Sequence, residues 1–289
     1  MKPGDVVLDV GTGTGILSLL AARAGAARVY AVEQTSIASL AQELIASNNF
    51  SDTVEVIQSD LVDVELPEQV DVLVSEWLGG FGIDEGMLAP VLIARDRWLK
   101  PEGVMIPAAV VAWTALVEDA YLAETLAFLR GGPYGLDLNS LVEKTVNEVF
   151  YSGPGRHLTE GDLRSAAVEL WTTDARRISL ERARAPHEAE VALPVSGQGV
   201  ANALGLWFSA ELVAGTTLST GPGNPPTHWG MTTAPLREPV RLEAGSVVHA
   251  RVRTAPARSI GTWTSWAVKI RDTPWEEHDE QSVWAELED

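Results

Sequence analysis

A short apolar segment that runs directly into three alternating glycines constrains this chain more than any other feature. Residues 6–10 read Val-Val-Leu-Asp-Val, residues 11–15 read Gly-Thr-Gly-Thr-Gly, and a helix-compatible stretch begins at Ile16. Glycines spaced in this way let the backbone turn sharply and let its amides approach a ligand beside the amino terminus of a helix. The segment therefore predicts a strand, a ligand-binding loop and a helix at the carboxyl edge of a parallel sheet.

The glycine spacing and a second carboxylate narrow the class of ligand. A dinucleotide-binding loop follows the pattern G-x-G-x-x-G, and its last glycine would stand where this sequence has Ile16. Glu33 ends the second apolar segment, where a carboxylate can accept hydrogen bonds from both hydroxyls of a ribose. Together these features predict a nucleoside cofactor rather than a dinucleotide. The alternative is a simple glycine turn with a solvated Glu33.

The first part of the chain alternates short apolar segments with helical ones. This order predicts an α/β, Rossmann-like domain over residues 1–106. We expect its strands and helices at these positions: strands at 6–10, 28–32, 54–57, 70–74 and 103–106, and helices at 16–24, 37–48 and 86–99.

The pattern changes after Pro107 to β-branched alternation interrupted by glycine and proline. It predicts an antiparallel, β-barrel-like domain over residues 107–289. Two helical segments within it bracket a Gly-Gly-Pro-Tyr-Gly turn, which predicts an arm over about residues 121–155. Residues 275–289 are acidic and are expected to form an appended tail.

Composition excludes several kinds of chemistry and partner. The chain has no cysteine, so disulfides, thiol nucleophiles and cysteine metal sites are impossible, and its five histidines lack metal-ligand spacing. A formal charge of −19 disfavours binding to a nucleic acid backbone and favours a cationic substrate, or serves solubility alone. We find no apolar run long enough to span a membrane and no secretory signal at the start, so we expect a cytoplasmic location. Scarce lysine beside abundant alanine, arginine, glycine and proline suggests a bacterial source.

The loop after the fourth predicted strand carries two glutamates among glycines. Residues 75–87 read Ser-Glu-Trp-Leu-Gly-Gly-Phe-Gly-Ile-Asp-Glu-Gly-Met and contain Glu76 and Glu85. This loop resembles the double-glutamate loop of the protein arginine N-methyltransferase family. Three later segments resemble that family in the same order: Ala-Arg-Asp-Arg-Trp-Leu-Lys-Pro at 94–101, Tyr-Gly-Leu-Asp at 134–137 and Thr-His-Trp at 227–229. The resemblance spans residues 5 to 272.

The resemblance implies S-adenosyl-L-methionine as the cofactor and assigns a part of it to each residue of the sheet edge. Asp9 is expected to face its amino and sulfonium groups, and Glu33 its ribose. The remaining predicted cofactor contacts are Gly11, Gly13 and Gly15 at the methionine and sugar, and Asp60 with Leu61 at the adenine.

The resemblance also implies methyl transfer to a guanidino nitrogen of arginine in a protein or peptide. An arginine side chain stays protonated, so its nitrogens are poor nucleophiles until its charge is redistributed. Bidentate bonds from Glu76 and Glu85 would concentrate that charge on two nitrogens and leave the third free to react. His228 would orient Glu76 or accept the released proton. The expected substrate-binding residues are Trp77, Met87 and Trp229.

Some features depart from the family pattern. A tyrosine-containing helical segment that covers the cofactor and partners the histidine precedes the first strand in the family, so we expect an upstream start or a contribution from a second protomer. Gly80 stands in place of an aromatic residue, and Val62 in place of an acid. The arm predicts a homodimer. Two alternatives stay open: a tailoring enzyme for free arginine or another small guanidino compound, and a cofactor-binding scaffold with little activity.

Overall fold

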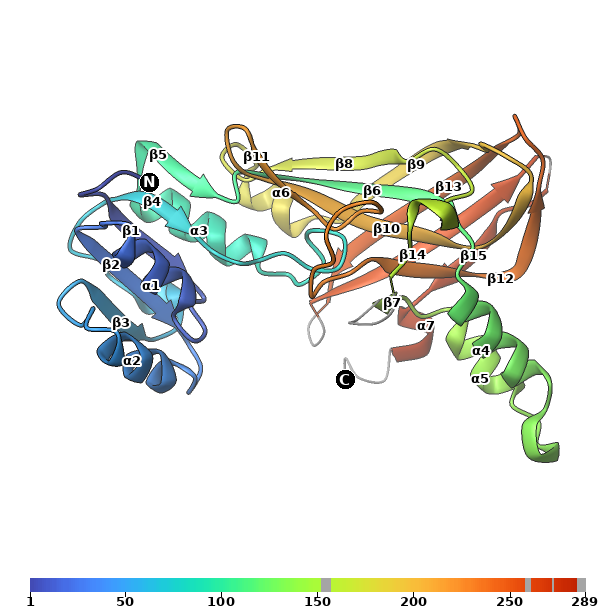
Figure 1. The fold of residues 1–289 in the computed structure, drawn as a ribbon, viewed down its shortest axis with the longest axis horizontal. Coiled ribbons are helices and arrows are strands. Elements are labelled where there is room, and N and C mark those ends of the chain that lie inside the picture. The colour runs from blue at the N-terminus through green and yellow to red at the C-terminus, as the bar shows by residue number, and fades with distance from the viewer. Residues whose placement is uncertain (152–156, 258–260, 272, 285–289) are drawn as a thin grey trace.

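Two regions of different topology follow one another along the chain. The computed structural model describes residues 1–151, 157–257, 261–271 and 273–284. A parallel sheet is formed by residues 6–106, and two antiparallel sheets follow it (Figure 1). This arrangement confirms the predicted Rossmann-like domain followed by antiparallel β structure.

The parallel sheet has five strands in the order β3-β2-β1-β4-β5. Its elements are β1 Val6–Val10, α1 Ile16–Arg23, β2 Arg28–Glu33, α2 Ala38–Ser47, β3 Val54–Gln58, η1 Leu61–Asp63, β4 Val70–Val74, α3 Leu88–Trp98 and β5 Leu99–Ile106. The predicted strands and helices all occur. The last strand begins earlier than expected, because the chain passes from α3 straight into extended backbone at Leu99.

Alternation along the strands gives the sheet two separate cores. Val7 packs with residues of α1 and α2, whereas its neighbour Leu8 packs with residues of α3. Successive side chains of a strand point to opposite faces, so α1 and α2 cover one face and α3 covers the other. Both faces are buried, as expected for a parallel sheet.

The antiparallel region contains a six-stranded and a four-stranded sheet. The larger has the order β7-β12-β10-β6-β8, with β11 paired to β10, and the smaller has the order β15-β14-β13-β9. The strands are β6 Ala109–Val117, β7 Phe150–Tyr151, β8 Val168–Asp174, β9 His187–Pro194, β10 Gly199–Val213, β11 Thr216–Ser219, β12 Thr232–Leu242, β13 Val247–Pro256, β14 Thr262–Ile270 and β15 Glu276–Asp279. Short helices are η3 Glu160–Asp162, α6 Leu180–Arg184 and α7 Gln281–Trp284.

The predicted antiparallel, barrel-like structure is confirmed, but the barrel is not closed, and the expectation of an appended tail was wrong for residues 276–284. Residues 285–289 of that expected tail lie outside the described residues. The sheets share a hydrophobic core but do not join into a closed barrel. Among the described residues, one isolated β-bridge joins them at this edge, between Ser165, just before β8, and Val195, just after β9. The acidic end is also not a mere tail, because β15 pairs with β14 and α7 follows it. His278 explains the difference: its ring is buried and stacks on Trp266, so the segment has an inward-facing aromatic anchor despite its acidity.

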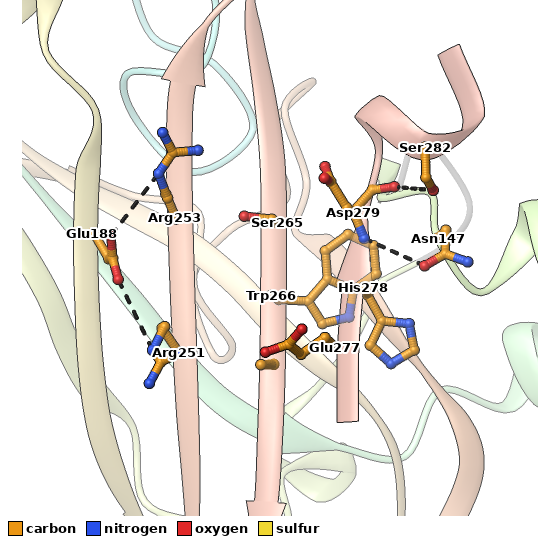
Figure 2. Close-up of a pocket in the computed structure, with 11 residues that line it drawn as sticks. Asn147, Glu188, Arg251, Arg253, Ser265, Trp266, Glu277, His278, Asp279 and Ser282 are labelled. Atoms are coloured by element: carbon orange, nitrogen blue, oxygen red, sulfur yellow. Dashed lines mark hydrogen bonds and ion pairs between the residues drawn. The ribbon is translucent and has the colours of Figure 1, made fainter. Parts of the chain in front are cut away.

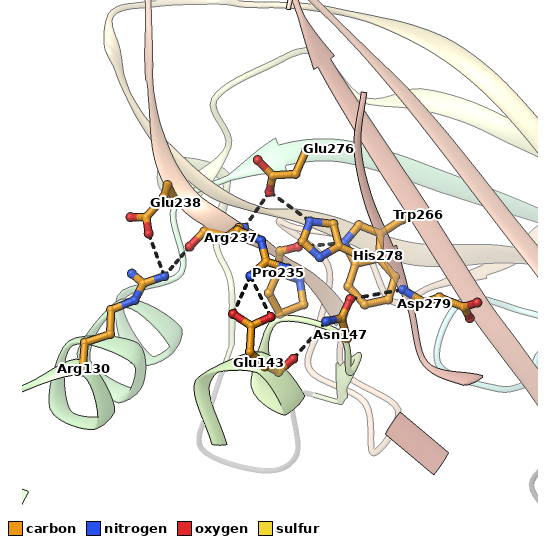
Figure 3. Close-up of polar contacts among 10 residues, drawn as sticks. All are labelled: Arg130, Glu143, Asn147, Pro235, Arg237, Glu238, Trp266, Glu276, His278 and Asp279. Carbon is orange, nitrogen blue, oxygen red and sulfur yellow. Dashed lines mark hydrogen bonds and ion pairs between the residues drawn. The ribbon is translucent and has the colours of Figure 1, made fainter. Parts of the chain in front are cut away.

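The predicted arm projects from the larger sheet as α4 Ala120–Arg130, η2 Pro133–Gly135 and α5 Asn139–Thr145 (Figure 1). Polar contacts hold its base (Figure 3). Arg237 pairs with Glu143 of α5 at 2.6 Å, and its backbone N–H donates to Glu276 at 2.6 Å. Glu276 also bonds Nε2 of His278 at 2.9 Å. The arm is therefore tied through β12 to the four-stranded sheet. Residues 152–155 of the predicted arm lie outside the described residues.

The four-stranded sheet carries a surface hollow of about 460 Å³ (Figure 2). Arg251 pairs with Glu190 at 2.9 Å, and Arg253 lies 3.9 Å from Glu188. Neighbouring glutamates therefore already balance the charges of both arginines. We assign this hollow no ligand. Within the part of the chain that the structure describes, no helix is long and apolar enough to cross a membrane.

Candidate active site

The glycine loop forms as the sequence predicts. The backbone N–H groups of Gly11 and Thr12 both donate to the carbonyl of Val32, at 2.9 and 3.0 Å, which folds the loop over the end of β2. Gly13 has φ +56°, and a Cβ placed there would meet no atom within 4 Å. An L-residue would be strained at this φ, and the open space beside the loop leaves room for a ligand to approach the backbone.

Asp9 joins the glycine loop to the helix that follows it. It is fully buried at the end of β1, and its Oδ2 accepts hydrogen bonds from Thr12 at 2.6 Å and Ser18 at 2.7 Å. Burial raises the pKa of this carboxyl, although the two hydroxyls oppose that effect. One carboxylate oxygen thus ties the glycine loop to α1. The other, Oδ1, is buried without a hydrogen-bond partner among the described residues.

Glu33, which stands 20 residues beyond Gly13 in the chain, also lies at the glycine loop. The residue is 8% exposed, and its carboxylate accepts hydrogen bonds from the N–H of Gly13 at 3.1 Å and of Thr35 at 2.8 Å. Burial acts to raise the pKa of Glu33, but these N–H donors outweigh it and lower the pKa. The group is therefore an ionised acceptor with lone pairs left for further donors.

The edge beyond β3 carries the remaining predicted cofactor contacts. Asp60 is exposed and begins η1 by accepting a hydrogen bond from the N–H of Val62 at 3.1 Å. Leu61 is buried at 8% exposure in the core beneath it. Parallel register puts the ends of β1, β2 and β3 at one edge, so these residues share that edge with Glu33. The open loop and the unpartnered oxygen of Asp9 fit a polar nucleoside at this edge.

The double-glutamate loop crosses from the parallel sheet to the antiparallel region. Ser75 fixes its start by donating to the carbonyl of Val10 at 2.6 Å. Trp77 is 1% exposed and packs in the core beside α3, whereas Phe81 is fully buried in the core between the antiparallel sheets. Both sides of the molecule therefore anchor this loop. Trp77 lies in the core rather than at a cavity, so we leave it out of the substrate site.

Asp84 holds the loop in shape, and sequence reasoning missed it. Its buried carboxylate accepts hydrogen bonds from the N–H groups of Gly80 at 2.9 Å and Phe81 at 3.1 Å. The hydroxyl of Tyr151 donates to it as well, at 3.2 Å. Burial raises the pKa of Asp84, and these donors oppose the rise. The sequence signal was only an acid between Ile83 and Glu85 in a glycine-rich loop.

Glu76 and Glu85 lie close enough to repel one another. Burial of the Glu85 carboxylate, followed by the charges of Glu76 and Asp84, raises its pKa to about 7. Both glutamates are exposed as residues, and Glu76 also accepts a hydrogen bond from the N–H of Leu78 at 2.8 Å. The loop thus gathers negative charge at one place, which favours a cation there.

The Thr-His-Trp segment lines a cavity together with the double-glutamate loop. Trp229 donates from Nε1 to the carbonyl of Leu78 at 2.8 Å, and the His228 ring lies over it at a centroid distance of 3.9 Å. A cavity of about 460 Å³ lies beside them. Its lining residues are Gly80, Asp84, Glu85, Tyr151, His228, Trp229 and Gly261. Of the predicted acceptor-site residues, the cavity thus joins Glu85, His228 and Trp229.

Met87 and Glu76 lie outside that lining. A Cβ placed at Gly11 would come within 3.5 Å of Cε of Met87, so this methionine lies between the glycine loop and the double-glutamate loop. Gly261 and Thr262 were not predicted. Thr262 donates to the carbonyl of Asp84 at 2.8 Å, and a Cβ at Gly261 would lie 2.9 Å from the carbonyl oxygens of Asp84 and Glu85.

The fold and the sheet edge define the class of the protein: it is an S-adenosylmethionine-dependent methyltransferase. Residues 1–108 match the family model of ribosomal protein L11 methyltransferase, and residues 108–265 match the arginine methyltransferase oligomerization subdomain. Protein arginine N-methyltransferase 6 of Xenopus tropicalis is 34% identical over 259 residues, which cover 88% of this chain and 76% of the relative. The chain therefore belongs to the protein arginine N-methyltransferase family.

Other relatives agree. Protein arginine N-methyltransferase PRMT10 of Oryza sativa subsp. japonica is 36% identical over 272 residues, covering 85% of this chain and 71% of its own. The Trypanosoma brucei PRMT1 enzyme–prozyme heterotetrameric complex with AdoHcy is similar in fold, with a TM-score of 0.86, 28% identity and coverage of 96% and 89% of the two chains. Arabidopsis thaliana protein arginine methyltransferase 10 has a TM-score of 0.79 and 28% identity, covering 96% of this chain and 88% of its own.

Proposed function

We propose that residues 1–106 bind S-adenosylmethionine and that residues 107–289 complete a site for an arginine side chain of a protein or peptide. The observation that carries this proposal is the gathering of Glu76, Asp84 and Glu85 beside an aromatic cavity. Burial first, and then the charges of Glu76 and Asp84, raise the pKa of Glu85 to about 7. A guanidinium is planar, always charged and suited to bidentate bonds with carboxylates. Its arrival would relieve the repulsion between Glu76 and Glu85.

The cofactor would be held at the carboxyl edge of the parallel sheet. The open backbone at Gly11 and Gly13 would cradle it, and Gly15 starts the helix beside it. Glu33 would accept its ribose hydroxyls, and Asp60 with Leu61 would border its adenine. When bound, S-adenosylmethionine supplies a methyl group on an electrophilic sulfonium.

The chain's own residues prepare the acceptor nitrogen. Glu76 and Glu85 hold two guanidinium nitrogens, draw positive charge toward them and leave the third nitrogen with an available lone pair. Trp229, fixed by its bond to Leu78, walls the pocket against water. His228 lines the same cavity and is placed to orient a glutamate or accept the released proton. Met87, between the two loops, borders the transfer path.

A turnover assay with two acceptors tests this proposal. The purified protein is incubated with methyl-labelled S-adenosylmethionine and either an Arg-Gly-rich peptide or free arginine. We expect label on the peptide, and label on free arginine alone would favour the small-guanidino alternative. Glu85→Gln should abolish labelling while calorimetry still shows S-adenosylhomocysteine binding, and Glu102→Gln, an exposed glutamate on β5, serves as the matched control. Label on an oxygen or carbon acceptor instead would refute the guanidinium assignment.

We also propose that the protein is a homodimer formed through its arm. The arm exposes large apolar side chains, among them Phe128, Tyr134, Leu136 and Leu141. The helices beside the glycine loop expose a second apolar set: Ile16 and Leu20 of α1, with Ile37 and Leu40 at α2. Exposed apolar side chains gathered in this way favour contact with a partner. In a homodimer, the arm of each copy can cover the apolar residues of α1 and α2 on the other copy. Light scattering should give twice the chain mass for wild type and the chain mass for Tyr134→Ser/Leu136→Ser; a wild-type monomer would contradict the dimer.

A further inference from the structure

Tyr151 lies at the acceptor cavity although its strand is only two residues long. It pairs with Thr232 of β12, three residues beyond Trp229, and this register brings it beside the Thr-His-Trp segment. The residue is 55% exposed and lines the cavity together with Glu85 and His228. Its position therefore comes from strand pairing across 81 residues of sequence and not from a local motif.

Gly80 makes room for the Tyr151 ring. A Cβ built at Gly80 would lie 2.4 Å from Cε1 of Tyr151 and 2.3 Å from the hydroxyl of Thr232. Non-bonded heavy atoms repel one another strongly at these distances, so the ring or the loop would have to move. The ring thus occupies the space that a side chain at Gly80 would take, and it is supplied from β7 instead of from the loop.

The hydroxyl of Tyr151 links the same ring to the loop that carries Glu85. It donates to Oδ2 of Asp84, a residue that is 4% exposed and whose carboxylate also accepts hydrogen bonds from the N–H groups of Gly80 and Phe81. Asp84 directly precedes Glu85. A shift of the tyrosine would therefore disturb the residue next to the glutamate that faces the cavity.

We propose that Tyr151 is a substrate-positioning residue, whose ring forms an aromatic wall for the guanidinium and whose bond to Asp84 fixes Glu85. The proposal rests on the proposed function, since it assumes an arginine acceptor. A cation over an aromatic face is attracted by the ring quadrupole, and the negative charge of Glu85 at the same cavity holds the cation there. Tyr151 acts on acceptor binding, whereas the cofactor edge lies at the parallel sheet.

Steady-state kinetics with two substituted proteins tests the role. Tyr151→Ala should raise the KM for an Arg-Gly-rich peptide about tenfold, because ring contact with a cation is lost. Tyr151→Phe keeps the ring and removes only the bond to Asp84, so it should raise that KM less and lower kcat instead. The KM for S-adenosylmethionine should stay within about twofold in both. Phe150→Ala, on the same strand, is the control for a general disturbance of β7.

A double-substitution cycle with Gly80 provides a readout that a merely structural tyrosine would not give. Gly80→Ala should raise the peptide KM in the wild-type background because the new Cβ displaces the ring. In the Tyr151→Ala background it should raise the peptide KM by a smaller factor, because the clash with the ring is gone and only the one with the Thr232 hydroxyl remains. Additive effects on the peptide KM would overturn the proposal.

The remaining outcomes separate this role from the proposed function. An unchanged peptide KM in Tyr151→Ala, or an equal rise in Phe150→Ala, would overturn the role of Tyr151 while leaving arginine methylation intact. A wild-type protein that labels no arginine acceptor would overturn both. If Tyr151→Ala fails to bind S-adenosylhomocysteine, Tyr151→Phe and the Gly80→Ala protein decide the question, since each keeps an aromatic ring on β7.

Discussion

The acidity of Glu85 gives the most direct test of the acceptor site. Its pKa is raised from 4.5 to about 7, first by burial of the carboxylate and then by Glu76 and Asp84. Only the ionised form can hold a guanidinium, so a pKa of about 7 means that roughly nine in ten molecules are competent at pH 8 and one in ten at pH 6. We therefore expect kcat/KM for the peptide to fall about tenfold between these pH values.

An ordinary glutamate would behave differently. With a pKa of 4.5, more than about 95% of the groups would stay ionised at pH 6 and kcat/KM would barely change. The assay measures initial rates at low peptide concentration across pH 5.5 to 8.5, with S-adenosylmethionine saturating. Carbon-13 NMR of glutamate-labelled protein follows the carboxyl directly, and the spectrum of Glu85→Gln assigns the signal. A midpoint near 4.5 for that signal would refute the reasoning.

Replacing Glu76 separates the causes of the shift. Glu76→Gln removes the like charge with the larger effect on Glu85, so the Glu85 signal should titrate at a lower pH. Burial is the largest cause and persists in this protein, so the midpoint should fall but stay above 4.5. A midpoint that does not move, or one that returns all the way to 4.5, would show that the two carboxylates are arranged differently.

Three further perturbations test other parts of the structure. Glu33→Gln should weaken S-adenosylhomocysteine binding about tenfold by calorimetry, since a charged acceptor is lost, whereas Glu55→Gln on β3 should leave it unchanged. Arg95→Ala removes hydrogen bonds of 2.7 and 2.8 Å to two backbone carbonyls between β8 and α6, so the free energy of unfolding in urea should fall by about 3 kcal/mol. Arg97→Ala, which removes hydrogen bonds to carbonyls near η1, is the control, and an equal or larger fall there would contradict a special role of Arg95. Asp84→Asn leaves at least one loop N–H without its acceptor, so turnover should fall while S-adenosylhomocysteine binding persists; full activity would show that the loop holds its shape without the carboxylate.

The parallel sheet could be predicted because its signals are local. The glycine loop needs positive φ at Gly13, and only glycine tolerates that conformation at little cost, so the sequence marks the turn itself. Glu33 followed from its place at the end of an apolar strand, because parallel strands end at one edge. Side chains along β1 alternate in direction, and both kinds are apolar, with Val7 on one face and Leu8 on the other, so both faces of the sheet are covered.

The antiparallel region could be predicted only in outline, because its contacts are long-range. Nothing near Tyr151 in the sequence indicates that it pairs with Thr232 or meets Gly80. The acidity of residues 275–289 concealed a strand, since only His278 marks its inward side. Trp77 was also misplaced: a tryptophan beside a functional glutamate suits a substrate wall and a core equally well, and only packing distinguishes the two.

The anchoring of the double-glutamate loop explains why the acceptor site belongs to neither region alone. Trp77 buries itself beside α3, and Phe81 buries itself between the antiparallel sheets only four residues later. Asp84 receives a hydrogen bond from Tyr151 of β7, and its carbonyl receives another from Thr262 of β14. The position of Glu85 is thus set by side chains from both regions. Substitutions at the contact between the regions, such as Arg95→Ala, should therefore weaken acceptor binding more than cofactor binding. The cofactor edge is less sensitive because the parallel sheet builds it from its own strands.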